Sequence, residues 1–212
     1  MAVGKIREAD RRFSFVVERD PVALVGLHMQ SLVSWMIGET QEAERRAMRV
    51  FQLGYAPSGL QLSELAGEQG DLQASANYIA LGMRGMATGF DEAERTIMGQ
   101  GLFGDEALRA RAVQLADDYA ASDRPKTEIF IPYFLVRVGE VERGFRLYVE
   151  NRAAFDPLIY YAIWGPYGEK ARQHPAFVAF SEQVGLTSYW EQFGWPDVCD
   201  QPEETVLSCG VK

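Results

Sequence analysis

The stretch GQGLFG, residues 99 to 104, matches G-x-G-x-x-G, the glycine pattern of dinucleotide-binding sites. In those sites the glycines form a tight turn between a strand and a helix, and the pyrophosphate lies at the helix N-terminus. Here the preceding segment, residues 91–98, has the pattern of a helix, and Asp105 and Glu106 would repel a pyrophosphate. We therefore expect no cofactor, and a helix interrupted by glycines instead of a phosphate loop.

The other residues that could do chemistry do not form a recognisable catalytic or metal-binding group. His28 and His174 are the only histidines, and neither has a Cys, an Asp or a second His at metal-ligand spacing. His28 lies in an apolar segment, where we expect a hydrogen-bonded core residue, and His174 precedes a proline, as a loop or N-cap residue does. No serine lies in the G-x-S-x-G elbow of hydrolases. The sequence therefore predicts no catalytic residue and no metal site.

Cys199 and Cys209 are the only cysteines, and both lie near the end of the chain. Two cysteines are too few for a disulfide framework or a four-ligand zinc site, so we expect reduced thiols. The sequence has no apolar run of about 18 residues and no signal-peptide core at its beginning. These features predict a cytoplasmic protein.

Composition and charge restrict the classes of partner that we expect. The chain has 212 residues, of which 47% are hydrophobic, so a sizeable core can be buried. The formal net charge is -9, whereas nucleic-acid phosphates and anionic membrane surfaces attract clustered Lys and Arg. We expect neither nucleic acid nor a membrane as a partner.

A glycine followed by an acidic residue recurs along the chain at spacings of 32, 34 and 35 residues. The four copies are Gly38-Glu39, Gly70-Asp71, Gly104-Asp105 and Gly139-Glu140. Glycine commonly ends a helix, and an acidic residue at the next N-terminus is favoured by the helix macrodipole. Each copy therefore predicts a turn between two helices, and the spacing predicts a repeat.

Apolar side chains flank these turns at helical spacing, as Ala76, Ile79 and Met83 do after the second turn. The segment before the fourth turn, residues 129–138, is ambiguous, because a short apolar run also fits a buried strand. Pro132 is tolerated near the start of a helix, whereas in a central strand it would remove a ladder hydrogen bond. The repeat register also favours a helix, which we predict here.

This arrangement resembles the tetratricopeptide repeat (TPR), in which an inner helix A and an outer helix B alternate about every 34 residues. The fourth copy carries Ile131 at the helix A leucine position, Gly144 at the small position of helix B, Tyr148 at its aromatic position, and Asp156-Pro157 at the closing Asp-Pro, one residue late. Ala43 and Ser75 take the small position in the first two copies, whereas Arg109 takes it in the third. The resemblance covers residues 21–157 and implies an all-α fold, a right-handed α-solenoid of about four helical hairpins.

The last aromatic stretch, residues 174–199, resembles the end of the repeat regions in bacterial winged-helix transcriptional regulators and class III adenylate cyclases. Phe177, Phe180 and Val184 are expected on one helix face, and Tyr189, Trp190 and Phe193 together on the next. A repeat array leaves an apolar face exposed at each end, so we interpret this stretch as a cap. The predicted organisation is an N-terminal helix in residues 1–20, TPR-like repeats in 21–157, capping helices in 158–198 and a polar tail in 199–212.

The resemblance implies a non-catalytic scaffold that binds a protein or peptide on its concave face, in bacterial regulation or signalling. The ligand-facing positions of helix A in the family correspond to His28, Leu32, Trp35, Glu64, Tyr133 and Arg137. One alternative is a sensor or remnant domain of a larger regulator or cyclase. Another is an enzyme with a site between repeats that uses Glu64, Glu94 or Tyr133. The sequence does not define the partner or the oligomeric state.

Overall fold

The computed structural model describes residues 1–85, 89–124, 130–150, 158–200 and 208–209, and it is all-α. Within these residues the chain forms thirteen helices and one pairing of two-residue strands, β1 (Cys199–Asp200) and β2 (Ser208–Cys209). None of these helices is both long and apolar enough to cross a membrane. The helices are α1 (Ile6–Arg19), α2 (Leu24–Met36), α3 (Thr40–Gln52), α4 (Ser58–Glu68), α5 (Leu72–Gly85), α6 (Glu92–Phe103), α7 (Glu106–Ala121), α8 (Phe130–Arg137), α9 (Val141–Glu150), α10 (Leu158–Trp164), α11 (Glu169–Gln173), α12 (Ala176–Gln183) and α13 (Leu186–Phe193).

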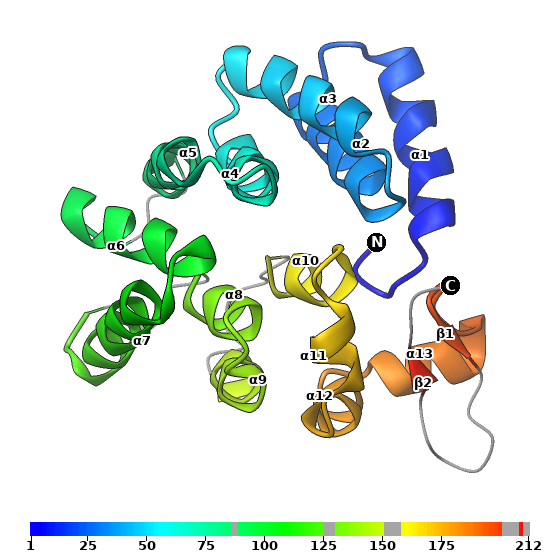
Figure 1. Cartoon of the computed structure of the whole chain (residues 1–212). Helices are drawn as coiled ribbons and strands as arrows, with labels where there is room; N and C mark the ends of the chain where they lie inside the picture. Colours follow the sequence, from blue (N-terminus) through cyan, green and yellow to red (C-terminus); the bar gives the residue numbers. More distant parts are fainter. Residues whose placement is uncertain (86–88, 125–129, 151–157, 201–207, 210–212) are drawn as a thin grey trace.

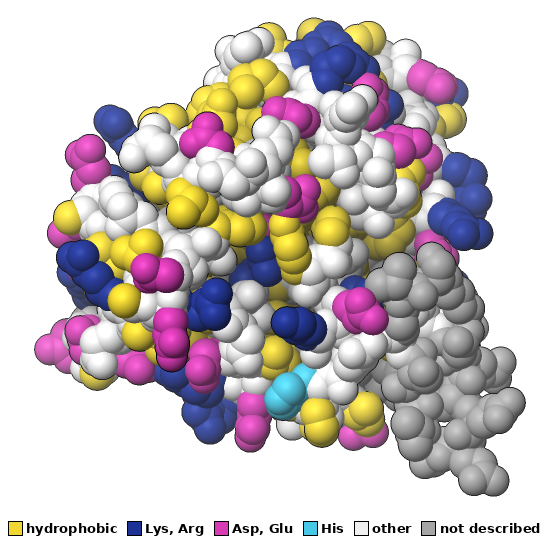
Figure 2. Space-filling view, viewed as in Figure 1, with side chains coloured by type: hydrophobic (Ala, Val, Ile, Leu, Met, Phe, Trp, Pro, Cys, Tyr) yellow, Lys and Arg dark blue, Asp and Glu magenta, His cyan; other side chains and the backbone are white. Residues whose placement is uncertain are grey.

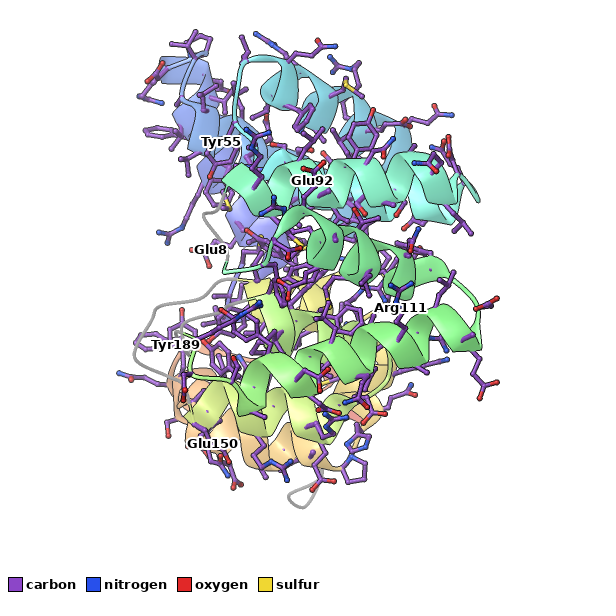
Figure 3. All side chains as sticks on the ribbon, turned by 90° about the vertical axis from the view of Figure 1, so that its left-hand side faces the viewer. Glu8, Tyr55, Glu92, Arg111, Glu150 and Tyr189 are labelled. Carbon is purple, nitrogen blue, oxygen red and sulfur yellow. A yellow bond between two sulfur atoms is a disulfide. The ribbon has the colours of Figure 1, made fainter. Side chains whose placement is uncertain are left out.

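Consecutive helices pack in pairs, α2 with α3, α4 with α5, α6 with α7 and α8 with α9. Figure 1 shows these pairs following one another along a curve, with α2, α4, α8 and α10 toward the middle and α5, α7 and α9 on the outside. Figure 3 shows the same pairs from the side, where successive helices cross the view in layers. Side chains of α2, α4, α8 and α10 meet on the inside of the curve, where they line one cavity.

Three of the four predicted glycine turns have left-handed backbone at the glycine. Gly38, Gly70 and Gly139 have φ angles of 85°, 80° and 99°, a region that residues with a Cβ rarely adopt. Gly104 differs, because its φ is -72° and the turn depends on Asp105, whose carboxylate accepts a hydrogen bond from the Leu108 amide. The predicted turns are confirmed, and so is the helix before the fourth turn, α8.

The glycine-rich stretch lies inside α6, and the predicted interruption of that helix is wrong. A Cβ on Gly99 would collide with Ile79 of α5, and a Cβ on Gly101 would collide with Ala112 of α7. The two glycines therefore let neighbouring helices approach α6 closely on two sides. Close helix packing accounts for a pattern that resembled a phosphate loop.

The small residues that were predicted near the start of the second helix of each pair also permit close packing, except in the third pair. Ala43 and Ser75 are fully buried, and a Cβ on Gly144 would lie 2.9 Å from the Pro132 carbonyl oxygen. In the third pair Arg109 is exposed, and Ala112, three residues later, takes the buried place. The register of this pair is therefore shifted by nearly one helical turn.

The beginning of the chain packs against the last helices. The indole nitrogen of Trp190 donates to the Val3 carbonyl at 2.9 Å, and that of Trp164 donates to the Ala2 carbonyl at 2.8 Å. Figure 1 shows the N-terminus beside α10, close to α13 and β1. We call this contact the terminal junction, which comprises residues 1–7, Trp164, Phe177, Trp190 and residues 195–197.

The predicted faces of the C-terminal helices are partly wrong. Phe177 and Phe180 of α12 are buried, and the Phe180 ring stacks on Phe145 of α9 at 4.2 Å between centroids. In α13, however, Trp190 is fully buried while Tyr189 and Phe193 are 36% and 54% exposed. These three residues do not share a face, because α13 presents Trp190 to the terminal junction and turns its neighbours toward solvent.

Cys199 and Cys209 form a disulfide, so the prediction of reduced thiols is wrong. The chain returns on itself in the antiparallel pairing of β1 with β2, which places the two Cα atoms 4.0 Å apart. Both cysteines are buried. Disulfides are rare in the reducing cytosol, so this bond argues against the predicted cytoplasmic location, which stays a prediction.

Candidate functional site

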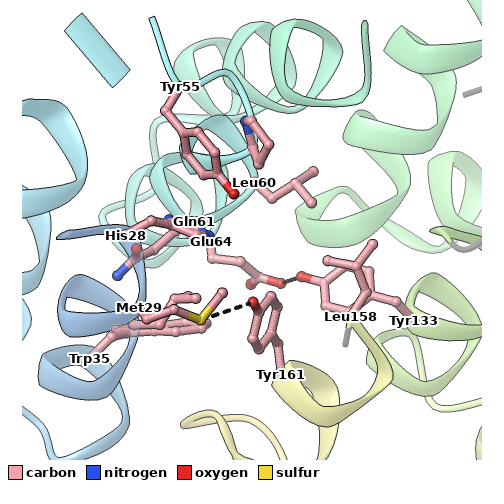
Figure 4. A pocket seen from close by; sticks show the side chains of 12 residues that line it. His28, Met29, Trp35, Tyr55, Leu60, Gln61, Glu64, Tyr133, Leu158 and Tyr161 are labelled. Carbon is pink, nitrogen blue, oxygen red and sulfur yellow. Dashed lines mark hydrogen bonds between the residues drawn. The ribbon is translucent and has the colours of Figure 1, made fainter. Parts of the chain in front are cut away.

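A cavity of about 160 Å³ lies on the inside of the curve, between α2, α4, α8 and α10. Its upper edge in Figure 4 includes Tyr55 from the segment between α3 and α4. Met29, Tyr55 and Pro57 are half-buried and form its mouth, whereas the other lining side chains are buried. The cavity is lined by His28, Met29, Leu32, Trp35, Tyr55, Pro57, Leu60, Gln61, Glu64, Tyr133, Leu158 and Tyr161.

The helix period explains why these residues meet. Side chains three or four positions apart share one face of a helix, so α2 directs His28, Leu32 and Trp35 to the same side. By the same rule α4 directs Leu60 and Glu64 inward. The cavity is thus lined by the inner faces of helices that come from different pairs.

The residues predicted for a ligand groove gather here. His28, Leu32, Trp35, Glu64 and Tyr133 line the cavity, and Arg137 contacts Glu64 directly behind its wall. Their role in binding a ligand stays a prediction.

Glu64 is the charged group of the cavity wall, and its carboxylate is held by two residues of α8. Arg137 donates from Nε to Oε1 at 2.8 Å and from an Nη to Oε2 at 2.5 Å, and the Tyr133 hydroxyl also donates to Oε1. The side chains of Arg137 and Glu64 are 8% and 2% exposed. A bidentate pair of this kind is strong and fixes the orientation of both groups. It connects α4 to α8 at the cavity wall.

The ion pair also governs the protonation of these groups. Burial raises the pKa of the Tyr133 hydroxyl well above its ordinary value, and the negative charge of Glu64 raises it further. For Arg137, burial lowers the pKa, but the Glu64 carboxylate outweighs burial and the net shift is upward. Tyr133 therefore stays neutral and Arg137 stays charged, so the cluster has no net charge.

Aromatic rings pack against the Arg137 guanidinium, from Phe103 and Tyr167. The guanidinium lies 4.0 Å from the ring centre of Tyr167, in the segment between α10 and α11. Tyr167 also contacts Trp35, whose indole nitrogen donates to Glu68 at 3.1 Å. Burial and the Glu68 carboxylate raise the pKa of Tyr167. Of these residues, Trp35 lines the cavity.

His28 is a neutral wall residue. Its Nδ1 lies 3.1 Å from the Ser58 hydroxyl, and its ring packs on Tyr55 at 5.2 Å between centroids. Burial lowers the pKa of His28 to about 4. The imidazole is therefore uncharged near neutral pH, as expected for a hydrogen-bonded core histidine.

The three residues of the alternative enzyme site are not brought together. Glu64 and Tyr133 are in contact, but Glu94 lies in the first turn of α6, where it completes a capping box with Asp91. The Glu94 carboxylate pairs with Arg124 at 2.9 Å. Glu94 thus stabilises the start of a helix and does not line the cavity.

Seven of the twelve lining residues were not predicted from the sequence, and three of them, Met29, Leu60 and Gln61, lie on the inner helices α2 and α4 beside residues that were. Tyr55 and Pro57 belong to a connecting segment that carries no repeat position, and Leu158 and Tyr161 lie on α10, which was assigned to the cap. The spacing of three residues between Leu158 and Tyr161 was a usable signal, because residues at this spacing share one helix face, as the inward residues of α2 and α4 do. Extending the predicted repeat by one more inner helix would have identified Leu158 and Tyr161.

Comparisons with protein-family models, curated proteins and solved structures return no match for the chain. Among the described residues, no group of three or more His, Cys, Asp or Glu side chains is placed to hold a metal ion. The function is therefore inferred from the geometry of the cavity.

Proposed function

We propose that this protein is a non-catalytic, TPR-like α-solenoid scaffold that binds a protein or peptide partner on its concave inner face. One observation carries the proposal: inner helices of different pairs converge on an apolar cavity whose mouth is half-exposed. Ligand sites in proteins are typically concave and apolar with a few well-placed polar groups.

The charges around the cavity favour binding over catalysis. A general acid or base needs a pKa near the working pH, and a nucleophile needs an adjacent base. Glu64 is instead held by Arg137 and Tyr133, and His28 is neutral and bonded to Ser58. These groups orient one another and form a rigid wall.

The surface supports a protein or peptide as the partner. On the face shown in Figure 2, Lys and Arg side chains are interspersed with Asp and Glu and with hydrophobic groups. A nucleic-acid partner would require clustered basic side chains, and the whole chain has a net charge of -9. Mixed surfaces with an apolar centre are typical of protein interfaces.

The test is peptide selection followed by photo-crosslinking. Peptides selected from a random displayed library on the wild-type protein are expected to bind saturably with one peptide per chain in calorimetry. A photoreactive residue placed at Met29, at the cavity mouth, is expected to crosslink to them.

The matched control places the same photoreactive residue at Leu72, which is 46% exposed on the outer helix α5. Crosslinking at Leu72 but not at Met29 would show that peptides bind the outside. Failure to select any saturable binder would also contradict the proposal.

A further inference from the structure

We infer that the cavity is an anchor pocket for one neutral, single-ring side chain of the partner, phenylalanine or tyrosine. This inference rests on the proposed function, because it names the part of the partner that the inner face recognises. It is carried by the size of the cavity, the pairing of its charges and the placement of its hydroxyl groups.

The size of the cavity limits its occupant to about one ring. Its volume is about 160 Å³. An apolar cavity of about 150 Å³ in a well-studied enzyme binds benzene, whereas a helix with its side chains is about 10 Å wide. A single six-membered ring is therefore the best match to this volume, and a helix does not fit. The backbone of the partner must remain outside, near Met29, Tyr55 and Pro57.

The charge of the cavity wall selects a neutral occupant. Both oxygens of Glu64 already accept hydrogen bonds from Arg137, so neither charge is available to balance that of a ligand. A charged group would lose its hydration on entering and gain no opposite charge in return. His28 is neutral near pH 7 as well. Aspartate, glutamate, lysine and arginine side chains are therefore disfavoured.

The walls offer apolar surface along the sides and hydroxyl groups toward the centre. Leu32, Leu60 and Leu158 provide aliphatic contacts that suit the face of a ring. In Figure 4, Tyr55 and Tyr161 enter the cavity from opposite sides with their hydroxyl groups foremost, and the Tyr161 hydroxyl donates to Met29 Sδ at 3.9 Å. Burial raises the pKa of Tyr55, so its hydroxyl stays protonated and can donate to or accept from the phenol of a tyrosine.

The experiment measures binding of p-cresol, the side chain of tyrosine as a free molecule, to the full chain by calorimetry. Saturable binding with a Kd on the order of 1 mM is expected for a ligand of this size. Two further probes test selectivity: 4-methylbenzoate carries a negative charge in place of the hydroxyl group of p-cresol, and 2-naphthol adds a second ring. Each is expected to bind at least about tenfold more weakly than p-cresol.

The variant Leu60→Phe fills the cavity and is expected to weaken p-cresol binding at least about tenfold. Leu72→Phe makes the same change on the exposed face of α5 and should leave the Kd unchanged. If Leu60→Phe does not fold, Met29→Phe at the half-buried mouth replaces it. Thermal melting of each variant shows whether the fold is intact.

The inference is overturned if p-cresol does not bind, if the charged probe binds equally well, or if neither filling variant weakens binding. Its failure differs from that of the proposed function. Selected peptides that crosslink at Met29 but are not displaced by p-cresol would leave the scaffold standing and remove the anchor pocket. Binding of p-cresol without any selectable peptide would show a small-molecule site, which also overturns the assignment to a partner side chain.

Discussion

The inner cavity and the terminal junction are both built by helices, yet one contains empty space and the other is filled. Around the cavity, Glu64 and Arg137 join helices from different pairs through polar contacts, and about 160 Å³ stays open beside them. In the terminal junction, Trp190 is fully buried among the rings of Trp164, Phe177 and Trp195. A Cβ on Gly4 would lie 2.6 Å from Pro196.

The difference shows where stability and binding are separated in this molecule. Aromatic burial in the junction stabilises the fold, because each large ring removed from water contributes about 1.5 to 3 kcal/mol. The cavity lacks such contacts. Its buried ion pair fixes the positions of α4 and α8 relative to each other but adds little to the stability of the fold. The comparison can be tested by removing side chains, changing charge and adding volume in each region.

The largest effect is expected from Trp190→Ala in the terminal junction. The change removes a fully buried ring and its hydrogen bond to Val3, which should lower the free energy of unfolding by about 3 to 5 kcal/mol. Phe193→Ala, three residues later and 54% exposed, should cost less than about 1 kcal/mol. Chemical denaturation measures both. Equal effects would mean that the junction is not a filled core.

Removing one charge of the cavity wall is expected to cost about 3 kcal/mol. Glu64→Leu leaves the Arg137 guanidinium buried without its carboxylate, whereas replacing both partners removes the unpaired charge. The double variant Glu64→Leu with Arg137→Met should therefore recover most of the lost stability. A double variant that is less stable than Glu64→Leu alone would contradict this account.

Acid should destabilise the cavity through His28. The pKa of His28 in the folded protein is about 4, whereas its ordinary value is 6.5, so between these pH values the unfolded chain binds more protons than the folded one. Stability is therefore lost as the pH falls through this window, by about 2 kcal/mol between pH 7 and pH 5. His28→Gln should lose less stability over the same range. Parallel pH profiles for the two proteins would show that His28 is not the cause.

The smallest change in stability is expected when only side-chain volume is added, and it should differ between the cavity and the terminal junction. Leu60→Phe adds volume next to the open cavity and should change stability by less than about 1 kcal/mol. Phe177→Trp adds volume in the filled junction, where overpacking should cost about 1 to 3 kcal/mol. Thermal melting compares the two variants. A larger loss for Leu60→Phe would reverse the comparison.

Local patterns predicted the helices well, because each depends on neighbouring residues. The glycine turn at Gly38 and the helix before Gly139 follow from backbone preference and apolar period, and both are found. The structural role of GQGLFG could not be predicted, because its glycines make room for Ile79 and Ala112, which lie on other helices.

The same limit applies to the candidate site. Helix period gave the inward residues of α2, α4 and α8, whereas the pairing of Glu64 with Arg137 spans 73 residues and depends on tertiary packing. Tyr189 and Phe193 were misplaced because the first residues of the chain, which contact only one side of α13, determine which side is buried.

The hydrogen bond from the Arg7 amide to Asp197 joins residues 190 positions apart, so the first and last parts of the succession of helices contact each other. A linear stack of helix pairs frays from its ends, since each terminal pair has only one neighbour. Here the two ends are each other's neighbour, so α1 and α13 should lose amide-exchange protection together and not independently. Forming so distant a contact requires closing a loop of nearly the whole chain, which makes it a late and slow step of folding.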